Sequence, residues 1–178
     1  MEVLLDITKT VQQYGLYFVK MANYLVIKID YMKVFYESKL AKMLLWQGYN
    51  TITLGCFVFT KKKKEEMKQR VLNHEAIHVR QWEECMIASA VLLTFVMLLT
   101  GFSVWIYLLC PLWFYLQYGL EYAISYVYHL CRNRCWVNVG DKAYGNSAFE
   151  MEAEANEEVD GYLDVRTPFE FFRYYGII

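Results

Sequence analysis

The sequence is poor in proline and histidine and has no excess of charge of either sign. Among its 178 residues there are two prolines and three histidines, and 18 Lys and Arg stand against 19 Asp and Glu. Nucleic-acid binding relies on an excess of positive charge facing the phosphates, so the net charge of −1 argues against nucleic acid as a partner. Intrinsic disorder is excluded as well, because 57% of the residues are hydrophobic.

The cysteines do not form a recognised metal or disulfide pattern. No CxxC pair occurs, and the count of five is odd. Cys131 and Cys135 are four positions apart and could hold a metal with two further ligands, but reduced thiols that fill apolar space are the simpler interpretation. A secretory signal peptide is not expected, because Glu2, Asp6 and Lys9 interrupt the start of the chain and no positive segment leads into an apolar run.

The hydrophobic and aromatic contents are high. The hydrophobic fraction of 57% exceeds the roughly 45–50% of soluble domains, and the chain has 16 Tyr, 11 Phe and 5 Trp. Tyr and Trp favour the interface between lipid and water, since each combines an apolar ring with a polar group. The composition therefore predicts a mainly α-helical protein, of one domain with or without a membrane element, that lies at or in a membrane.

Residues 1–60 are predicted to form an N-terminal region that is amphipathic and partly β. Charged residues interrupt its apolar stretches, so it has no apolar span of about 20 residues, the length of one membrane crossing. Residues 24–36 partly alternate and allow a strand, and residues 38–46 have a helical pattern. Residues 51–60 are β-branched and aromatic and predict a strand, in which Gly55 marks a bulge or a close backbone approach.

The next segment, residues 61–85, begins with a run of four lysines and is predicted to continue as a helix. Lys61–Lys64 are expected to form a solvated turn before the helix, to bind anionic lipid headgroups on the cytoplasmic side, or to do both. Because positive residues favour the cytoplasmic side of a membrane, we expect these lysines on that side, together with Arg132 and Arg134.

Residues 86–130 are the most apolar part of the chain. They contain no Lys or Arg, one carboxylate, Glu121, and one histidine, His129. Because one crossing needs about 20 residues, this length allows two crossings joined by a turn at residues 101–103 or 110–111. The alternative is a pair of monotopic helices within one leaflet. We expect the transmembrane hairpin, because the stretch is apolar on all sides rather than along one stripe.

The segment from His74 to His78 reads HEAIH and matches the pattern HExxH. Histidines four residues apart lie on one face of a helix, so both imidazoles can bind one zinc ion at about 2.0–2.1 Å. Glu75 lies between them and can take a proton from a water at the metal, which is what metal-assisted hydrolysis needs. The alternatives are a helix with incidental histidines and a zinc site that has only a structural role.

A catalytic zinc ion has three protein ligands and one open position, so a third ligand must come from elsewhere in the chain. Two sources are available: His129, and a predicted acidic helix from Glu150 to Glu158. The helix belongs to the last predicted region, residues 131–178, which also contains a short loop at residues 140–142 and an aromatic tail.

Residues 149–154 read FEMEAE and resemble the second motif of gluzincin metallopeptidases, in which a glutamate on a downstream helix binds the zinc. The resemblance implies that Glu150 is the third ligand and that Glu154 supports the site from one turn further along. Glu152 and Glu154 are the alternative registers for the ligand. Of these two, Glu154 is the better substitute, because positions 150 and 154 share one face of the helix.

A wider resemblance covers roughly residues 50–178. Several segments are similar to motifs of a family of small, uncharacterised bacterial membrane-associated proteins that carry HExxH and a downstream FExEA. These segments are residues 53–59, 73–81, 118–122, 143–153 and 162–166. The resemblance implies a zinc site, but it names no substrate.

Other polar residues near the motifs are candidates for supporting roles. Glu121 is the one carboxylate in an apolar stretch and could fix the tautomer of a ligand histidine; pairing with an arginine near the surface is the alternative. Gln81 lies one turn beyond His78, either beside the metal or as a packing amide. One of Tyr144, Tyr162 and Arg166 could stabilise the oxyanion of a tetrahedral intermediate.

Together these features predict a membrane-embedded zinc peptidase of the gluzincin type, with a mainly α, metallopeptidase-like fold and a small β element before the HExxH helix. The predicted zinc ligands are His74, His78 and Glu150, and Glu75 is the predicted base. The expected partners are a peptide or membrane-protein substrate and membrane lipid, at the inner cell membrane with the metal site on the cytoplasmic side. The alternative function is a non-catalytic, zinc-stabilised membrane protein that acts as a partner or sensor.

Overall fold

The structure is a computed structural model that describes residues 32–45, 48–133 and 138–176. Within these residues the chain is mainly helical, with a small sheet that precedes the longest helix, and this confirms the predicted fold class at that level. The amphipathic pattern predicted before residue 32 lies outside the described residues.

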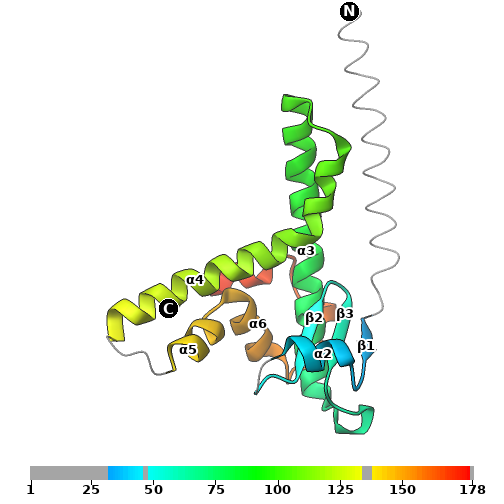
Figure 1. The fold of residues 1–178 in the computed structure, drawn as a ribbon, viewed down its shortest axis with the longest axis vertical. Coiled ribbons are helices and arrows are strands. Elements are labelled where there is room, and N and C mark those ends of the chain that lie inside the picture. Colours follow the sequence, from blue (N-terminus) through cyan, green and yellow to red (C-terminus); the bar gives the residue numbers. More distant parts are fainter. Residues whose placement is uncertain (1–31, 46–47, 134–137, 177–178) are drawn as a thin grey trace, which may run out of the picture.

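One long helix, α3 (Gln69–Thr100), organises the rest of the described chain (Figure 1). The sheet and the short helix α2 (Lys39–Leu44) lie beside the first half of α3. The helix α4 (Trp113–Asn133) leaves α3 at a steep angle. Two further helices lie beneath α4 in this view, namely α5 (Val139–Gly145) and α6 (Ala148–Asn156). The metal-binding pattern on α3 therefore faces elements from both the start and the end of the chain.

The sheet consists of β1 (Lys33–Phe35), β2 (Thr51–Leu54) and β3 (Phe57–Thr60), in the order β1-β3-β2. β1 runs parallel to β3, and β2 runs antiparallel to it. The strand predicted over residues 51–60 is thus a β-hairpin. Of the two roles expected for Gly55, it is not in a bulge, but its backbone does lie close to other residues, since a Cβ there would be 3.4 Å from the Trp82 ring. Gly55 lies in the turn with φ of +65°, a conformation that favours glycine, and its N–H donates to the Tyr115 hydroxyl at 2.6 Å.

The helix α3 is continuous through both the histidine pattern and the first part of the apolar segment. After the short helix η1 (Lys64–Glu66), it runs for 32 residues and ends at Gly101, whose φ of 71° and N–H bond to the Met97 carbonyl close the helix. Among the described helices, this one is long and apolar enough to cross a membrane by length and composition. The chain reverses at residues 101–103, which is one of the two turns that the sequence predicts.

The returning limb of this turn is η2 (Val104–Leu112), a short helix that packs back against α3. Met86, Ala90 and Cys110 are buried between the two limbs, and the Thr94 and Tyr107 hydroxyls are 2.7 Å apart. Pro111 lies near the end of η2, and α4 then leaves in a new direction. The structure therefore differs from a hairpin of two long parallel limbs: the second limb stops after nine residues.

The C-terminal region folds under α4 and forms the core there. Residues 140–142, predicted as a loop, belong to α5, because Val139 and Ala143 are buried in the contact between α4 and α5. Two short helices complete the chain: α7 (Tyr162–Val165) and η3 (Glu170–Tyr174). The core cluster joins α3, α4, α6 and η3 through Cys85, Phe114, Phe149 and Phe171. This cluster holds α6, with its glutamates, against the histidine-bearing face of α3.

Candidate metal centre

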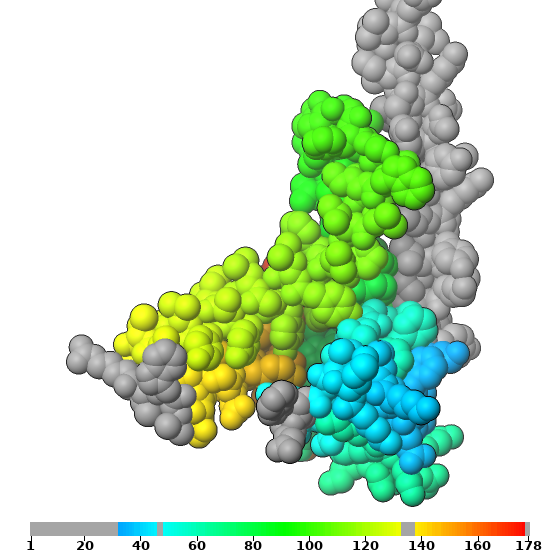
Figure 2. All heavy atoms as spheres, viewed as in Figure 1, coloured from blue at the N-terminus to red at the C-terminus, as the bar shows by residue number. Residues whose placement is uncertain are grey.

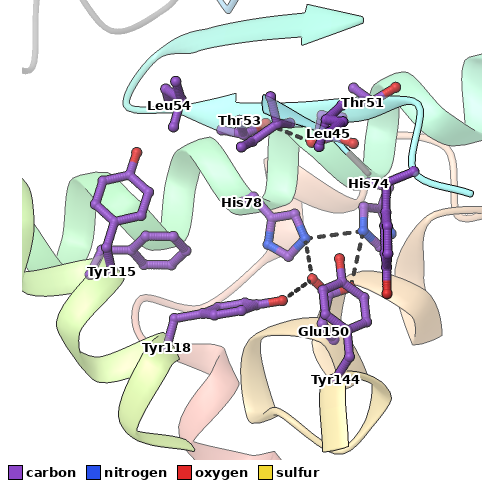
Figure 3. A pocket seen from close by; sticks show the side chains of 14 residues that line it. Leu45, Thr51, Thr53, Leu54, His74, His78, Tyr115, Tyr118, Tyr144 and Glu150 are labelled. Atoms are coloured by element: carbon purple, nitrogen blue, oxygen red, sulfur yellow. Dashed lines mark hydrogen bonds and ion pairs between the residues drawn. The ribbon is translucent and has the colours of Figure 1, made fainter. Parts of the chain in front are cut away.

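Three side chains from two helices converge on one point, as Figure 3 shows. His74 and His78 come from consecutive turns of α3, and Glu150 comes from the first turn of α6. The two Nε2 atoms of the histidines are 3.0 Å apart. Oε2 of Glu150 is 3.3 Å from Nε2 of His74, and Oε1 is 3.2 Å from Nε2 of His78. Each residue thus directs one potential ligand atom at the same small space.

The arrangement fits a zinc ion in both chemistry and spacing. Ligand atoms around a tetrahedral zinc ion at about 2.0–2.1 Å lie roughly 3.3 Å from one another, close to the separations between these donors. Two imidazoles and one carboxylate are a common ligand set for catalytic zinc. Oε2 of Glu150 is buried and has no hydrogen-bond partner among the described residues, since Nε2 of His74, at 3.3 Å, does not reach hydrogen-bond geometry. Such an oxygen is unfavourable unless a cation is bound there.

The charges at the centre are strongly coupled. Burial opposes the charged form of His78, but the nearby Glu150 carboxylate outweighs burial and raises the pKa of His78 to about 9. Burial alone would raise the pKa of Glu150, but the two histidines hold that pKa well below its usual range. In the metal-free protein His78 therefore carries a proton beside an ionised Glu150, and a divalent cation can take the place of that proton.

Each histidine has a partner behind it that turns its Nε2 atom toward the centre. Nδ1 of His74 is 3.2 Å from Oε2 of Glu157, and Nδ1 of His78 is 2.8 Å from Oε1 of Gln81. Because both partners offer an oxygen acceptor, the Nδ1 atoms carry hydrogen and the Nε2 atoms are free to bind a metal. Gln81 is itself held in the core, where its amide nitrogen donates to the Phe149 carbonyl and to Glu152.

Two tyrosines flank Glu150 on the side away from α3. The Tyr118 hydroxyl of α4 donates to Oε1 of Glu150 at 2.7 Å, and Tyr144 of α5 lies close to both of these residues (Figure 3). Burial and the negative charge of Glu150 raise the pKa of Tyr118 and of Tyr144 well above the ordinary value. Both hydroxyls therefore stay neutral at physiological pH and can donate hydrogen bonds.

Glu75 lies in the same cavity as the three donors, and the sheet holds its carboxylate in place. Its carboxylate is buried, and Oε2 accepts a hydrogen bond of 2.6 Å from the hydroxyl of Thr53 on β2. The cavity has a volume of about 260 Å³. β2 forms one of its walls, and Phe114, Tyr115 and Tyr118 of α4 line it as well. The cavity thus combines a metal-binding point, a carboxylate and an apolar lining.

Of the candidates for the third ligand, the structure brings only Glu150 to the histidines among the described residues. Glu152 points into the core on the other side of α6, where it is fully buried beside Arg166. Glu154 is exposed to solvent, and the contact with His74 that supports the site comes from Glu157 instead. His129 lies on α4, where its Nε2 atom is 2.6 Å from the amide of Asn146.

Glu121 does not contact a histidine, so that expectation is wrong. Its Oε2 atom accepts hydrogen bonds from the Ser147 hydroxyl at 2.9 Å and from the backbone N–H of Ala148 at 3.0 Å, and Tyr175 donates to its other oxygen. A carboxylate at the first N–H groups of a helix interacts favourably with the positive end of the helix. Glu121 therefore fixes the start of α6 at Ala148, two residues before the metal-site residue Glu150.

Tyr162 and Arg166 lie outside the cavity, so neither is a candidate for stabilising an oxyanion there. The Arg166 guanidinium is buried between Glu84 and Glu152, with a closest distance of 2.5 Å to each. The Tyr162 hydroxyl donates to Glu152 at 3.0 Å. Because Glu152 also binds Gln81, this buried ion cluster supports His78 from a distance instead of touching a substrate. Tyr144 is the one of the three oxyanion candidates that lines the cavity.

Three functional partners were not predicted from the sequence: Thr53, Tyr118 and Glu157. Glu157 is seven positions beyond Glu150, so a helical pattern of i and i+7 could have indicated it. Tyr118 and Thr53 both lie in segments that resemble family motifs, but no local pattern links either residue to the glutamate that it contacts.

Comparisons of the chain with protein-family models, with characterised proteins and with solved structures found no match. A function for this protein must therefore be argued from its own residues. The resemblance to gluzincin motifs stays a prediction, and the arrangement of the metal centre is the observation that bears on it.

Proposed function

We propose that the protein is a zinc-dependent peptidase of the gluzincin type. The observation that carries this proposal is the convergence of His74, His78 and Glu150 in a cavity that also contains the carboxylate of Glu75. A structural zinc site is usually closed by four protein ligands, whereas a catalytic site has three and keeps one position open. Three donors beside a cavity favour the catalytic type.

A zinc ion held by these three residues would supply a Lewis acid that polarises a carbonyl group and acidifies a water molecule. The role of Glu75 is to accept the proton of the attacking water and to deliver it to the leaving amine. The hydrogen bond from Thr53 fixes one carboxylate oxygen of Glu75, so that the other oxygen can carry the proton. Tyr144 is a neutral donor that can bind the developing oxyanion.

A peptide is the substrate that the sheet favours. β2 is at the edge of the three-stranded sheet, and Thr51, Thr53 and Leu54 line the cavity. An extended peptide can add to such an edge through main-chain hydrogen bonds, which bring its carbonyl groups past the metal centre. The apolar cavity wall formed by Leu54, Phe114 and Tyr115 favours a hydrophobic side chain next to the scissile bond.

The proposed location is the inner cell membrane, with the metal centre on the cytoplasmic side. Arg132 is the first basic residue after the apolar residues 86–130 and lies at the end of α4, and positive residues next to a membrane favour the cytoplasmic side. The substrate in this setting is a peptide or a membrane-protein segment.

The proposal is tested with the purified full chain loaded with zinc and incubated with denatured casein, whose new termini are identified by mass spectrometry. The Glu75→Gln variant should keep its zinc but lose cleavage by 10²–10⁴-fold, the usual contribution of a general base. The matched control is Glu66→Gln, which changes a carboxylate of η1 that bonds only to the nearby Lys63 N–H among the described contacts.

A non-catalytic zinc protein would give a different result. In that case the wild type, Glu75→Gln and Glu66→Gln would all bind zinc and none would cleave the casein or a library of fluorogenic peptides. Equal cleavage by the wild type and Glu75→Gln would contradict the assigned role of Glu75.

A further inference from the structure

The hairpin formed by the end of α3 and η2 exposes large apolar side chains on its outer surface. Phe95, Leu99, Phe102, Trp105 and Leu108 are between 59% and 73% exposed. The hairpin projects beyond the body that the sheet and the C-terminal helices form (Figure 2). An exposed apolar surface of this extent is unfavourable in water and indicates a partner that covers it.

The length of the hairpin matches half a bilayer. The part of α3 that exposes apolar residues begins at Val91 and ends at Thr100, which is roughly 15 Å at 1.5 Å per residue. The returning limb η2 has nine residues, or about 18 Å at the rise of a 3₁₀ helix. The hydrocarbon core of a bilayer is about 30 Å thick, so both limbs reach only to its centre.

The helix α3 is long enough to cross a membrane only if its first half is counted, and that half is part of the folded body. Glu75, Gln81 and Glu84 are buried within that body by the sheet and by α6. This first half of α3 carries the metal centre and cannot face lipid.

A second apolar surface lies along α4. Leu116, Leu120, Ile124 and Val127 of α4 recur at every third or fourth position and, with Leu112 at the end of η2, are 57% to 67% exposed, so they form one stripe. The other side of α4 contacts α5, and its Ser125 is buried. Figure 1 shows α5 and α6 beneath α4, whereas the hairpin rises on its other side. The apolar stripe and the hairpin therefore belong to the same side of the molecule.

The two apolar surfaces come from a segment that is almost free of charge. The one carboxylate between residues 86 and 130 is Glu121, and both of its oxygens are bonded to residues of the body. The first basic residue beyond the stripe is Arg132, whose guanidinium lies 5.7 Å from the ring of Tyr128 at the far end of α4. A tyrosine and an arginine at the end of an apolar helix are typical of the water–lipid interface.

We propose that the protein is monotopic: the α3–η2 hairpin enters one leaflet of a bilayer, and α4 lies flat in the interface of that leaflet. This replaces the expectation of two full crossings. With α4 in the plane of the interface and the hairpin perpendicular to it, a single partner, the bilayer, covers both apolar surfaces. A second copy of the chain would have to match a projecting hairpin and a stripe that run in different directions.

The monotopic arrangement also determines how far other parts of the molecule lie from the bilayer. Phe114 and Tyr115 line the metal cavity and belong to the helix that rests on lipid, so the cavity lies just outside the leaflet. Lys61–Lys64 lie at the opposite end of α3 from the hairpin tip, which excludes them from contact with the headgroups of that leaflet. Of the two interpretations of the lysine run, this arrangement favours a turn before the helix, in which the Lys61 ammonium donates to the Leu45 carbonyl at 3.0 Å. The monotopic arrangement does not depend on zinc binding or on peptidase activity.

Three cysteine variants of the full chain test the proposal. Ser103→Cys marks the hairpin tip, Leu120→Cys marks the α4 stripe, and Val165→Cys is the matched control. Val165 is 78% exposed, and both test positions are exposed as well, but Val165 belongs to α7, which lies beside the first turns of α3. Each chain is synthesised in a cell-free system with sealed phosphatidylcholine–phosphatidylglycerol vesicles. A membrane-impermeant maleimide is then added outside, or is present inside, and peptide mass mapping locates the modified thiol.

The monotopic arrangement predicts that the outside reagent modifies Val165→Cys and modifies the other two positions at least tenfold more slowly. The enclosed reagent should modify none of the three. Modification of Ser103→Cys by the enclosed reagent would show that the hairpin crosses both leaflets and would overturn the proposal. Equal modification of all three positions by the outside reagent would show that both apolar surfaces face water and would also overturn the proposal. If Ser103→Cys and Leu120→Cys were modified as slowly without vesicles as with them, a second copy of the chain would be what covers the two surfaces.

Discussion

Replacement of Glu157 should weaken zinc binding although this residue does not reach the metal position. Oε2 of Glu157 is 3.2 Å from Nδ1 of His74, and the Glu157 side chain is only 9% exposed. Without an acceptor at Nδ1, the His74 ring can change tautomer or rotate, and Nε2 is then no longer presented to zinc. Loss of such a partner typically lowers metal affinity 10–100-fold.

Two substitutions of Glu157 should lower zinc affinity to different extents. Glu157→Gln keeps an oxygen that can accept from Nδ1, so we expect a loss of about tenfold, or about 1.4 kcal/mol. Glu157→Ala removes the acceptor and should reach about 100-fold, or about 2.7 kcal/mol. Glu157 also binds Arg70 at 2.5 Å, so part of any effect could come from that ion pair.

The neighbouring carboxylate provides the control for that ion pair. Glu158 also faces Arg70, at 3.4 Å, but does not contact His74 and is 76% exposed. Glu158→Gln should therefore change zinc affinity less than twofold, since exposed ion pairs contribute little. Affinity is measured on the full chain by competition with a zinc chelator of known dissociation constant at fixed pH. Wild-type affinity in a folded Glu157→Ala variant would refute the assigned role of Glu157.

Three further predictions concern the surroundings of the metal. Because the pKa of His78 is raised to about 9, zinc binding at pH 7 should release about one proton from this residue, and calorimetry in buffers of different ionisation enthalpy measures that release. For the same reason, zinc affinity should rise about tenfold per pH unit and level off above pH 9. Gln81→Leu should lower zinc affinity about 10–100-fold in the chelator assay, since it removes the acceptor at Nδ1 of His78. Glu121→Gln should lower the free energy of unfolding by about 1 kcal/mol in urea, because it weakens the cap of α6, while zinc affinity falls less than tenfold.

The parts of the site that the sequence predicted well depend on local geometry. His74 and His78 share a face because of the 3.6-residue period of one helix, and no tertiary contact is needed to infer this. The turn at Gly101 was also predictable, because glycine readily adopts the positive φ that ends α3. The position of Glu150 came from a resemblance to a motif, and the structure brings that residue, and not Glu152 or Glu154, to the histidines.

The supporting contacts were missed because they join residues that are far apart in the chain. Glu157 is 83 positions from His74, Tyr118 is 32 from Glu150, and Thr53 is 22 from Glu75. No periodicity connects such pairs, since packing between helices decides which side chains meet. Glu121 shows the same effect: its unusual surroundings were evident, but its partner is the start of α6 and not a histidine.

The sequence left two arrangements of the apolar segment open, a transmembrane hairpin and monotopic helices, for a related reason. The length and composition of residues 86–130 are sufficient for two crossings, but length does not reveal where a chain changes direction. The change occurs at residues 111–113, where η2 ends and α4 begins, and it converts the second limb into a short return and a lateral helix. The exposed apolar positions of α4, which are three or four residues apart, could be recognised as one stripe only once this boundary was known.

The most direct test of the proposed metal centre is the zinc content of the purified full chain and of two matched variants of α6. After incubation with excess zinc and removal of the unbound metal, mass spectrometry should find about one zinc ion per wild-type chain. Glu150→Gln should retain less than a tenth of that amount, whereas Glu154→Gln, which alters an exposed carboxylate one turn away, should retain all of it. A wild-type chain without zinc, or full occupancy in Glu150→Gln, would contradict a metal centre formed by His74, His78 and Glu150.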